Sequence, residues 1–144
     1  MATQRPAGIG HPRYAENHPR TAEAAAQARR LVRAAFRLWD LDHLTDRGEL
    51  VITELVGNAV RHTSCPLVRL IVARPSPDWV RLAVVDRAPR KLPRIREVCA
   101  DDTTGRGLFL VDAYSDRWGY DLMGTKPGAP WGKAVWSELG ITER

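Results

Sequence analysis

Three segments that lie far apart in the chain carry side chains suited to binding a phosphorylated ligand. Glu54 and Asn58 are four residues apart, Asp86 ends a run of apolar residues, and Gly105 and Gly107 precede a short apolar segment. An amide oxygen such as that of Asn58 can ligate Mg²⁺, a hard cation that retains most of its water and binds phosphates. A carboxylate one helical turn earlier could polarise an attacking hydroxyl or water.

The other two segments suit the remaining parts of a nucleotide. A carboxylate at the end of a strand, as predicted for Asp86, could accept a hydrogen bond from the amino group of adenine. Glycines at a helix N-terminus let backbone N–H groups approach phosphates, and the helix dipole favours anions there. Taken together, these residue types predict a nucleotide site.

The segment that carries Glu54 and Asn58 is predicted to be an amphipathic helix over residues 46–62. In steps of 100° per residue, its apolar side chains fall on one side of the helix. These are Ile52, Leu55, Val56 and Ala59. Glu54 and Asn58 fall on the other side, where residues at i and i+4 are neighbours.

The rest of the chain alternates between helical and extended patterns. A preceding helix is predicted from the spacing of Leu31, Ala35 and Leu38, which favours one buried face. Strands are predicted at residues 67–74, 79–86, 117–122 and 133–139, and a short helix at 108–114. This order predicts an α+β fold, a two-layer α/β sandwich with helices on one face of a mixed, mostly antiparallel sheet.

The chain has 144 residues, which is the size of one domain. Residues 1–20 contain several prolines and glycines and show no periodicity, so we expect a flexible N-terminal tail. The domain is then predicted to cover residues 21–144.

The charge balance bears on partners and location. The chain has 22 Lys and Arg against 17 Asp and Glu, a net charge of +5. A basic chain can bind nucleic acid or an acidic partner. Because the arginines are scattered and no recognition helix is evident, the sequence predicts no nucleic-acid partner. No apolar stretch is long enough for a membrane span or a signal peptide, so we expect a cytoplasmic protein with no membrane partner.

One basic cluster stands out from this scatter. It consists of Arg87, Arg90, Lys91, Arg94 and Arg96. The cluster is compatible with a solvated loop and with a patch that faces phosphates or a partner.

The motifs together resemble a known family. The segment from Glu54 to His62, the Gly-Arg-Gly-Leu box that begins at Gly105 and the Gly-Lys-x-Val-Trp sequence that begins at Gly132 are similar to those of the GHKL ATPases. These proteins have the Bergerat ATP-binding fold, also called the histidine-kinase-like ATPase domain. The resemblance covers about residues 22–139 and is strongest to the small, single-domain anti-sigma-factor serine/threonine kinases.

This resemblance implies a role for each matching position. Glu54 would be the catalytic general base, Asn58 would ligate Mg²⁺, and Asp86 would bind the adenine amino group of ATP. Ala88 would stand where the family's adenine box carries a glycine. The ATP lid and phosphate box would comprise Thr103, Thr104, Gly105, Arg106, Gly107 and Leu108.

The resemblance also implies a function. The protein would transfer phosphate from ATP to a Ser or Thr of an anti-anti-sigma (STAS) partner and would sequester a sigma factor, with a homodimer as a further expectation. An alternative is a regulator that binds ATP weakly or not at all and acts through protein contacts. The alternative rests on the sequence Asp86-Arg87-Ala88-Pro89, which lacks the family's glycine and in which Pro89 removes a backbone N–H.

Overall fold

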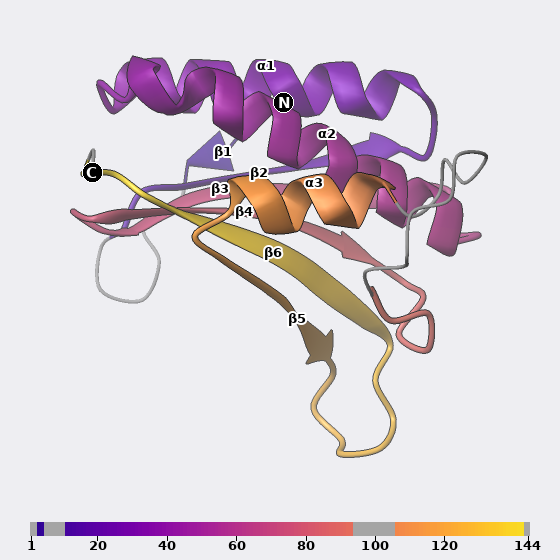
Figure 1. Ribbon diagram of the computed structural model, residues 1–144. Coiled ribbons are helices and arrows are strands. Elements are labelled where there is room, and N and C mark those ends of the chain that lie inside the picture. The colour runs from indigo at the N-terminus through magenta and orange to yellow at the C-terminus, as the bar shows by residue number, and fades with distance from the viewer. Residues whose placement is uncertain (1–2, 5–10, 94–105, 143–144) are drawn as a thin grey trace.

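The computed structural model describes residues 3–4, 11–93 and 106–142. The elements, in chain order, are β1 (Thr3–Gln4), β2 (Arg13–Pro19), α1 (Glu23–Leu38), a 3₁₀ turn η1 (Asp42–Leu44), α2 (Thr45–His62), β3 (Leu67–Ser76), β4 (Trp79–Asp86), α3 (Arg106–Tyr114), β5 (Arg117–Met123) and β6 (Gly132–Gly140). The strands form one sheet in the order β1-β2-β3-β4-β6-β5. Figure 1 shows α1, α2 and α3 on one side of this sheet. The predicted two-layer α+β sandwich is therefore confirmed.

Within the described part of the chain, every strand pair is antiparallel. The sheet is thus simpler than the mixed sheet that we expected. The chain needs no parallel crossover because α3 leads into β5, which pairs with the far side of β6 rather than with β4.

The prediction of a flexible tail over residues 1–20 is wrong for residues 13–19. These form β2, which pairs with β3 from Arg13↔Ala73 to Pro19↔Leu67. Ala15 is the only fully buried side chain in β2, so the strand lacks the apolar alternation that would identify it in the sequence. Its backbone hydrogen bonds are satisfied by β3, and Pro19 lies at the end of the strand, where prolines are tolerated.

The core lies between the helices and the inner face of the sheet. From α2 it takes the predicted face, Ile52, Leu55, Val56 and Ala59, together with Val51. Leu31 and Ala35 of α1 are buried as predicted, but Leu38 at the end of α1 is 66% exposed. The helical period holds until the last turn, where Trp39 packs against the core in place of Leu38.

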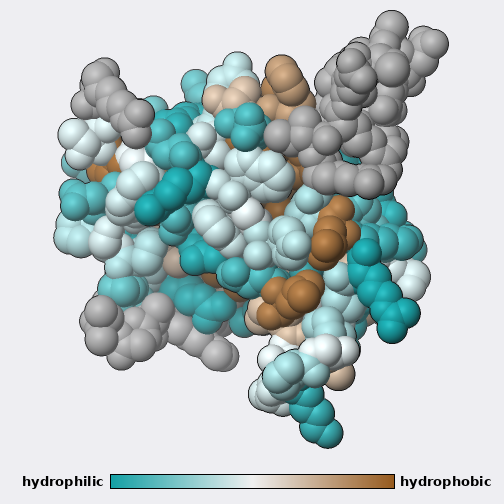
Figure 2. Space-filling model, turned by 60° about the horizontal axis from the view of Figure 1, so that its bottom comes forward, coloured by the Kyte–Doolittle hydropathy of each residue, from teal (hydrophilic) through white to brown (hydrophobic). Residues whose placement is uncertain are grey.

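Arginine side chains cover part of the outer face of the sheet. Arg81 of β4 lies 4.5 Å from the ring of Trp136 on β6 and forms a 3.1 Å ion pair with Asp121 on β5. Figure 2 brings the lower side of the molecule forward and shows a mainly hydrophilic surface with small, separate hydrophobic patches. The sheet therefore has one apolar face, toward the helices, and the site is built at the end of that face.

Candidate nucleotide site

Helix α2 presents three polar side chains at intervals of four residues, Glu54, Asn58 and His62. Glu54 is half-buried, and Asn58 is only 4% exposed although the helical period placed it on the polar side. Helix α3 packs against α2. The amide nitrogen of Asn58, Nδ2, is buried and has no hydrogen-bond partner among the described residues. A buried amide N–H without a partner is costly, so this atom is available to a ligand group or a water molecule.

Asp86 ends strand β4 and is 1% exposed. Its carboxylate oxygen Oδ1 accepts a 2.8 Å hydrogen bond from the backbone N–H of Ala88. The second oxygen, Oδ2, is buried as well. The structure thus brings two predicted site residues, Asp86 and Ala88, into direct contact.

Lys133 of β6 lies opposite Asp86 in the register of the two strands. Its side chain is fully buried, and Nζ lies 2.9 Å from both carboxylate oxygens of Asp86. Nζ also donates a 2.9 Å hydrogen bond to the backbone carbonyl of Ala88. The ammonium therefore ties the end of β4 to the loop that follows it.

Gly132 allows β6 to approach this point closely. A Cβ atom at position 132 would collide with the carbonyl oxygen of Asp86. The Gly-Lys pair of the sequence motif thus has a structural reason, because the glycine lets the strand approach and the next residue points at the carboxylate.

His62, at the end of α2, lies in the electrostatic field of this pair. Burial of its ring, followed by the charges of Lys133, Arg61 and Lys91, lowers the pKa of His62 below its ordinary value of 6.5, and Asp86 opposes the shift. The ring nitrogen Nδ1 is buried without a hydrogen bond to the described residues. His62 therefore has a buried polar atom close to Asp86 and Lys133.

A basic cavity of about 490 Å³ opens beside these residues. It is lined by His62, Thr63 and Ser64, by Ala88 and Pro89, and by five cations, Arg20, Arg61, Arg87, Arg90 and Lys91. None of the described residues that line it is acidic, and its volume is in the range of small-molecule sites. Of the predicted basic cluster, Arg87, Arg90 and Lys91 face this cavity, while Arg94 and Arg96 lie outside the described residues.

The predicted lid is described only in part. Thr103, Thr104 and Gly105 lie outside the described residues. Arg106 and Gly107 are the first two residues of α3, so the helix begins at the phosphate box, two residues earlier than predicted. Leu108 is 5% exposed.

Comparison with known families identifies the domain. The sequence profile of the histidine kinase-like ATPase domain matches residues 18–130, which include α1, α2, β3, β4, α3 and β5. The chain belongs to this family. It is therefore a member of the GHKL ATPase superfamily, whose domains bind ATP. No curated protein matches the chain.

In this histidine kinase-like ATPase domain, Asn58 Nδ2 is a buried donor without a partner among the described residues, whereas both carboxylate oxygens of Asp86 contact Lys133. The basic cavity is lined by His62 and Ala88 but not by Glu54, Asn58 or Asp86, and its charge suits a polyanion. Among the described residues no cluster of three His, Cys, Asp or Glu side chains could hold a metal ion. A cation here would take its ligands from one side chain, phosphates and water, which is the usual situation of Mg²⁺.

Two features of this ATPase domain were not predicted as functional from its sequence. Lys133 was noted only as part of a motif and His62 only as the end of a helix. The available signal for Lys133 was its place on a predicted strand in register with the apolar residues Val135 and Leu139, because a charge on a buried face requires a partner. No helix in the described part of the chain is long and apolar enough to cross a membrane.

Proposed function

We propose that this protein is an ATP-dependent regulator that acts as an anti-sigma-factor serine/threonine kinase. The observation that carries the proposal is the match of residues 18–130 to the histidine kinase-like ATPase domain, within which Glu54 and Asn58 lie one turn apart on α2. Family membership and the resemblance of the motifs to the small single-domain kinases support it. The protein would phosphorylate a Ser or Thr of a STAS partner and, as a homodimer, sequester a sigma factor.

In this proposal each residue has a defined task. Glu54 would accept the proton of the attacking Ser or Thr hydroxyl, and Asn58 would hold Mg²⁺ through its amide oxygen. Asp86 would accept a hydrogen bond from the adenine amino group. The phosphate box, which includes the first residues of α3 from Arg106 to Leu108, would hold the phosphates with its N–H groups. The metal would neutralise charge on the phosphates. The product would act as a switch, because a phosphate adds negative charge to the partner's surface.

The decisive experiment is the transfer of labelled γ-phosphate from ATP to candidate STAS proteins. Removal of a general base typically lowers the rate by about 10²- to 10⁴-fold, so Glu54→Gln should show a loss of that size. Glu49→Gln is the matched control, because Glu49 lies on the same helix and pairs with Arg33 on the surface. Transfer that is unchanged in Glu54→Gln would exclude Glu54 as the base.

A second candidate function is that of a non-catalytic regulator. It is favoured by the contact between Asp86 and Lys133, and by Ala88 and Pro89 in place of the family's glycine. In that case the protein would bind its partners equally well with and without Mg-ATP. Pull-down of a sigma factor or STAS protein with and without Mg-ATP distinguishes the two functions, because a kinase would release its partner only when nucleotide is present.

A further inference from the structure

The groups that could hold a nucleobase in this structure are already engaged by the protein itself. Asp86 Oδ1 accepts hydrogen bonds from Lys133 and from the Ala88 N–H. The same lysine lies 2.9 Å from Oδ2 and donates to the Ala88 carbonyl. An exocyclic amino group of a base needs an acceptor of this kind, and the Lys133 ammonium is a donor of the same chemical type.

The position of Lys133 also closes the carboxylate to ligands. Both side chains have no exposed surface. The contacts of the buried ammonium with the carboxylate and the carbonyl offset the free-energy cost of removing it from water. A base can therefore reach Asp86 only after the ammonium has moved away.

The neighbouring strand offers a path for this movement. Leu122 of edge strand β5 lies opposite Lys133 in the register and is 52% exposed. A lysine stem can lie along apolar surface while its charged end reaches water. The ammonium could thus leave Asp86 along Leu122 toward the edge of the sheet.

We propose that Lys133 is an internal competitor of the nucleobase and sets the affinity of the site. The proposal rests on the proposed function, since it concerns the same site, and it identifies the residue that determines how tightly the amino group of a purine is held. Nucleotide binding then requires the ion pair to open, so the site is weak as long as Lys133 is present.

The test compares Mg-ATP affinity in wild type, Lys133→Met and Lys133→Arg. Met keeps an unbranched chain without a donor, so Lys133→Met should bind ATP at least about tenfold more tightly, a change of about 1.4 kcal/mol. Arg retains charge and donors, so Lys133→Arg should bind no more tightly than wild type. Equal or weaker binding in Lys133→Met would overturn the proposal.

A second ligand distinguishes competition between the Lys133 ammonium and the base amino group for Asp86 from a general loosening of the pocket. Mg-ITP carries an oxygen where ATP carries the amino group, so it cannot donate a hydrogen bond to the freed acceptor from that position. The gain in Lys133→Met should be confined to ATP, and an equal gain for ITP would contradict the proposed competition. If wild type and variants all fail to bind ATP, the proposed function fails as well, whereas binding by wild type with no gain in Lys133→Met refutes this inference alone.

A measurement on the wild-type chain keeps the premise testable if Lys133→Met does not fold. The sequence has three lysines, of which Lys91 and Lys126 are exposed and Lys133 is buried. Limited acylation followed by peptide mapping should modify Lys91 and Lys126 and leave Lys133 unmodified. Acylation of Lys133 at the rate of the other two would overturn the inference, because its ammonium would then not occupy Asp86.

Discussion

Asp86 and Lys133 form an ion pair with no exposed surface, joining two neighbouring strands at the end of the sheet. Removing one partner of such a pair is strongly destabilising because it leaves an uncompensated charge in the interior. Asp86→Asn should therefore lower the free energy of unfolding by about 3–5 kcal/mol. The double variant Asp86→Asn with Lys133→Met has no buried charge and should recover most of this loss. Urea unfolding of both variants measures the difference, and a cost below about 1 kcal/mol for Asp86→Asn would show that the pair is not buried in solution.

The lowered pKa of His62 predicts how the stability of the fold depends on pH. Its pKa is lowered in the folded protein, so the unfolded chain binds the proton more readily. The folded state therefore has its full stability above the ordinary pKa of 6.5 and loses part of it as the pH falls through the lowered value. His62→Gln should lose less stability on acidification from pH about 7.5 to about 5.5 than wild type does. Thermal unfolding at both pH values tests this, and equal losses in the two proteins would contradict the assigned environment.

Replacement of two glycines of α2 by alanine should change the free energy of unfolding in opposite directions. At Gly48 a Cβ would lie 2.7 Å from the ring of Phe36, so Gly48→Ala should cost about 1–3 kcal/mol through overpacking between α1 and α2. At Gly57 a Cβ would meet, among the described residues, only the end of the Arg61 side chain at 3.4 Å. Gly57→Ala should stabilise the fold by about 0.5–1 kcal/mol because alanine favours a helix. Chemical unfolding of both variants tests the packing, and a stable Gly48→Ala protein would rule out the close approach of the helices.

The apolar face of α2 could be predicted because helical periodicity is a local property of the sequence. The positions of Ile52, Leu55, Val56 and Ala59 were right for this reason. Strand β2 could not be predicted, because only Ala15 of its side chains is fully buried and its pairing with β3 is a contact over long sequence distance. Local patterns therefore gave the helices and the strands β3, β4, β5 and β6, but not β2.

The same distinction holds for the site. Glu54 and Asn58 lie one turn apart on a helix, so their proximity follows from spacing alone. The contact of Lys133 with Asp86 joins residues 47 positions apart, and it depends on the register of β4 and β6. The burial of Asn58 is likewise not contained in a local pattern, because the helical period places this residue on the polar side of α2.

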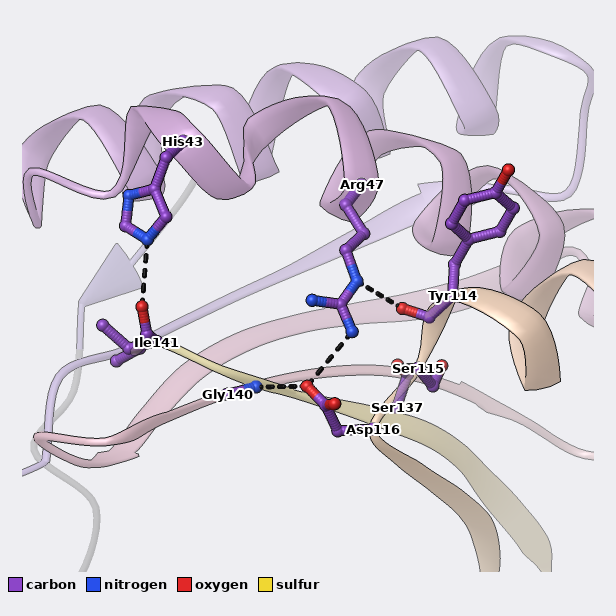
Figure 3. Close-up of polar contacts among 8 residues, drawn as sticks. All are labelled: His43, Arg47, Tyr114, Ser115, Asp116, Ser137, Gly140 and Ile141. Atoms are coloured by element: carbon purple, nitrogen blue, oxygen red, sulfur yellow. Dashed lines mark hydrogen bonds and ion pairs between the residues drawn. The ribbon is translucent and has the colours of Figure 1, made fainter. Parts of the chain in front are cut away.

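Arg47, at the start of α2, ties this helix to the far end of α3. Its Nε donates a 2.6 Å hydrogen bond to the carbonyl of Tyr114, and its guanidinium forms a 3.1 Å ion pair with Asp116, which also accepts a hydrogen bond from the Gly140 N–H (Figure 3). Because α3 begins at the phosphate box, this contact holds the helix that carries part of the proposed site.

Arg47→Ala should therefore lower the free energy of unfolding by about 1–2 kcal/mol, since hydrogen bonds to charged groups are stronger than neutral ones. Arg33→Ala is the matched control, because Arg33 forms a more exposed ion pair with Glu49 and should cost no more than about 0.5 kcal/mol. Equal effects of the two substitutions in urea unfolding would show that Arg47 does not anchor α3.

The central claim is that Asn58 and Asp86 lie in a site for ATP, and calorimetric titration with Mg-ATP tests it most directly. Wild type should give a saturable isotherm. Asn58→Ala should weaken binding at least about tenfold, because the bound Mg-ATP would lose its contact with the buried amide. Glu49→Gln, on the same helix but paired with Arg33 of α1, should leave the isotherm unchanged. Absence of binding by the wild-type protein, or equal affinity in wild type and Asn58→Ala, would contradict the claim.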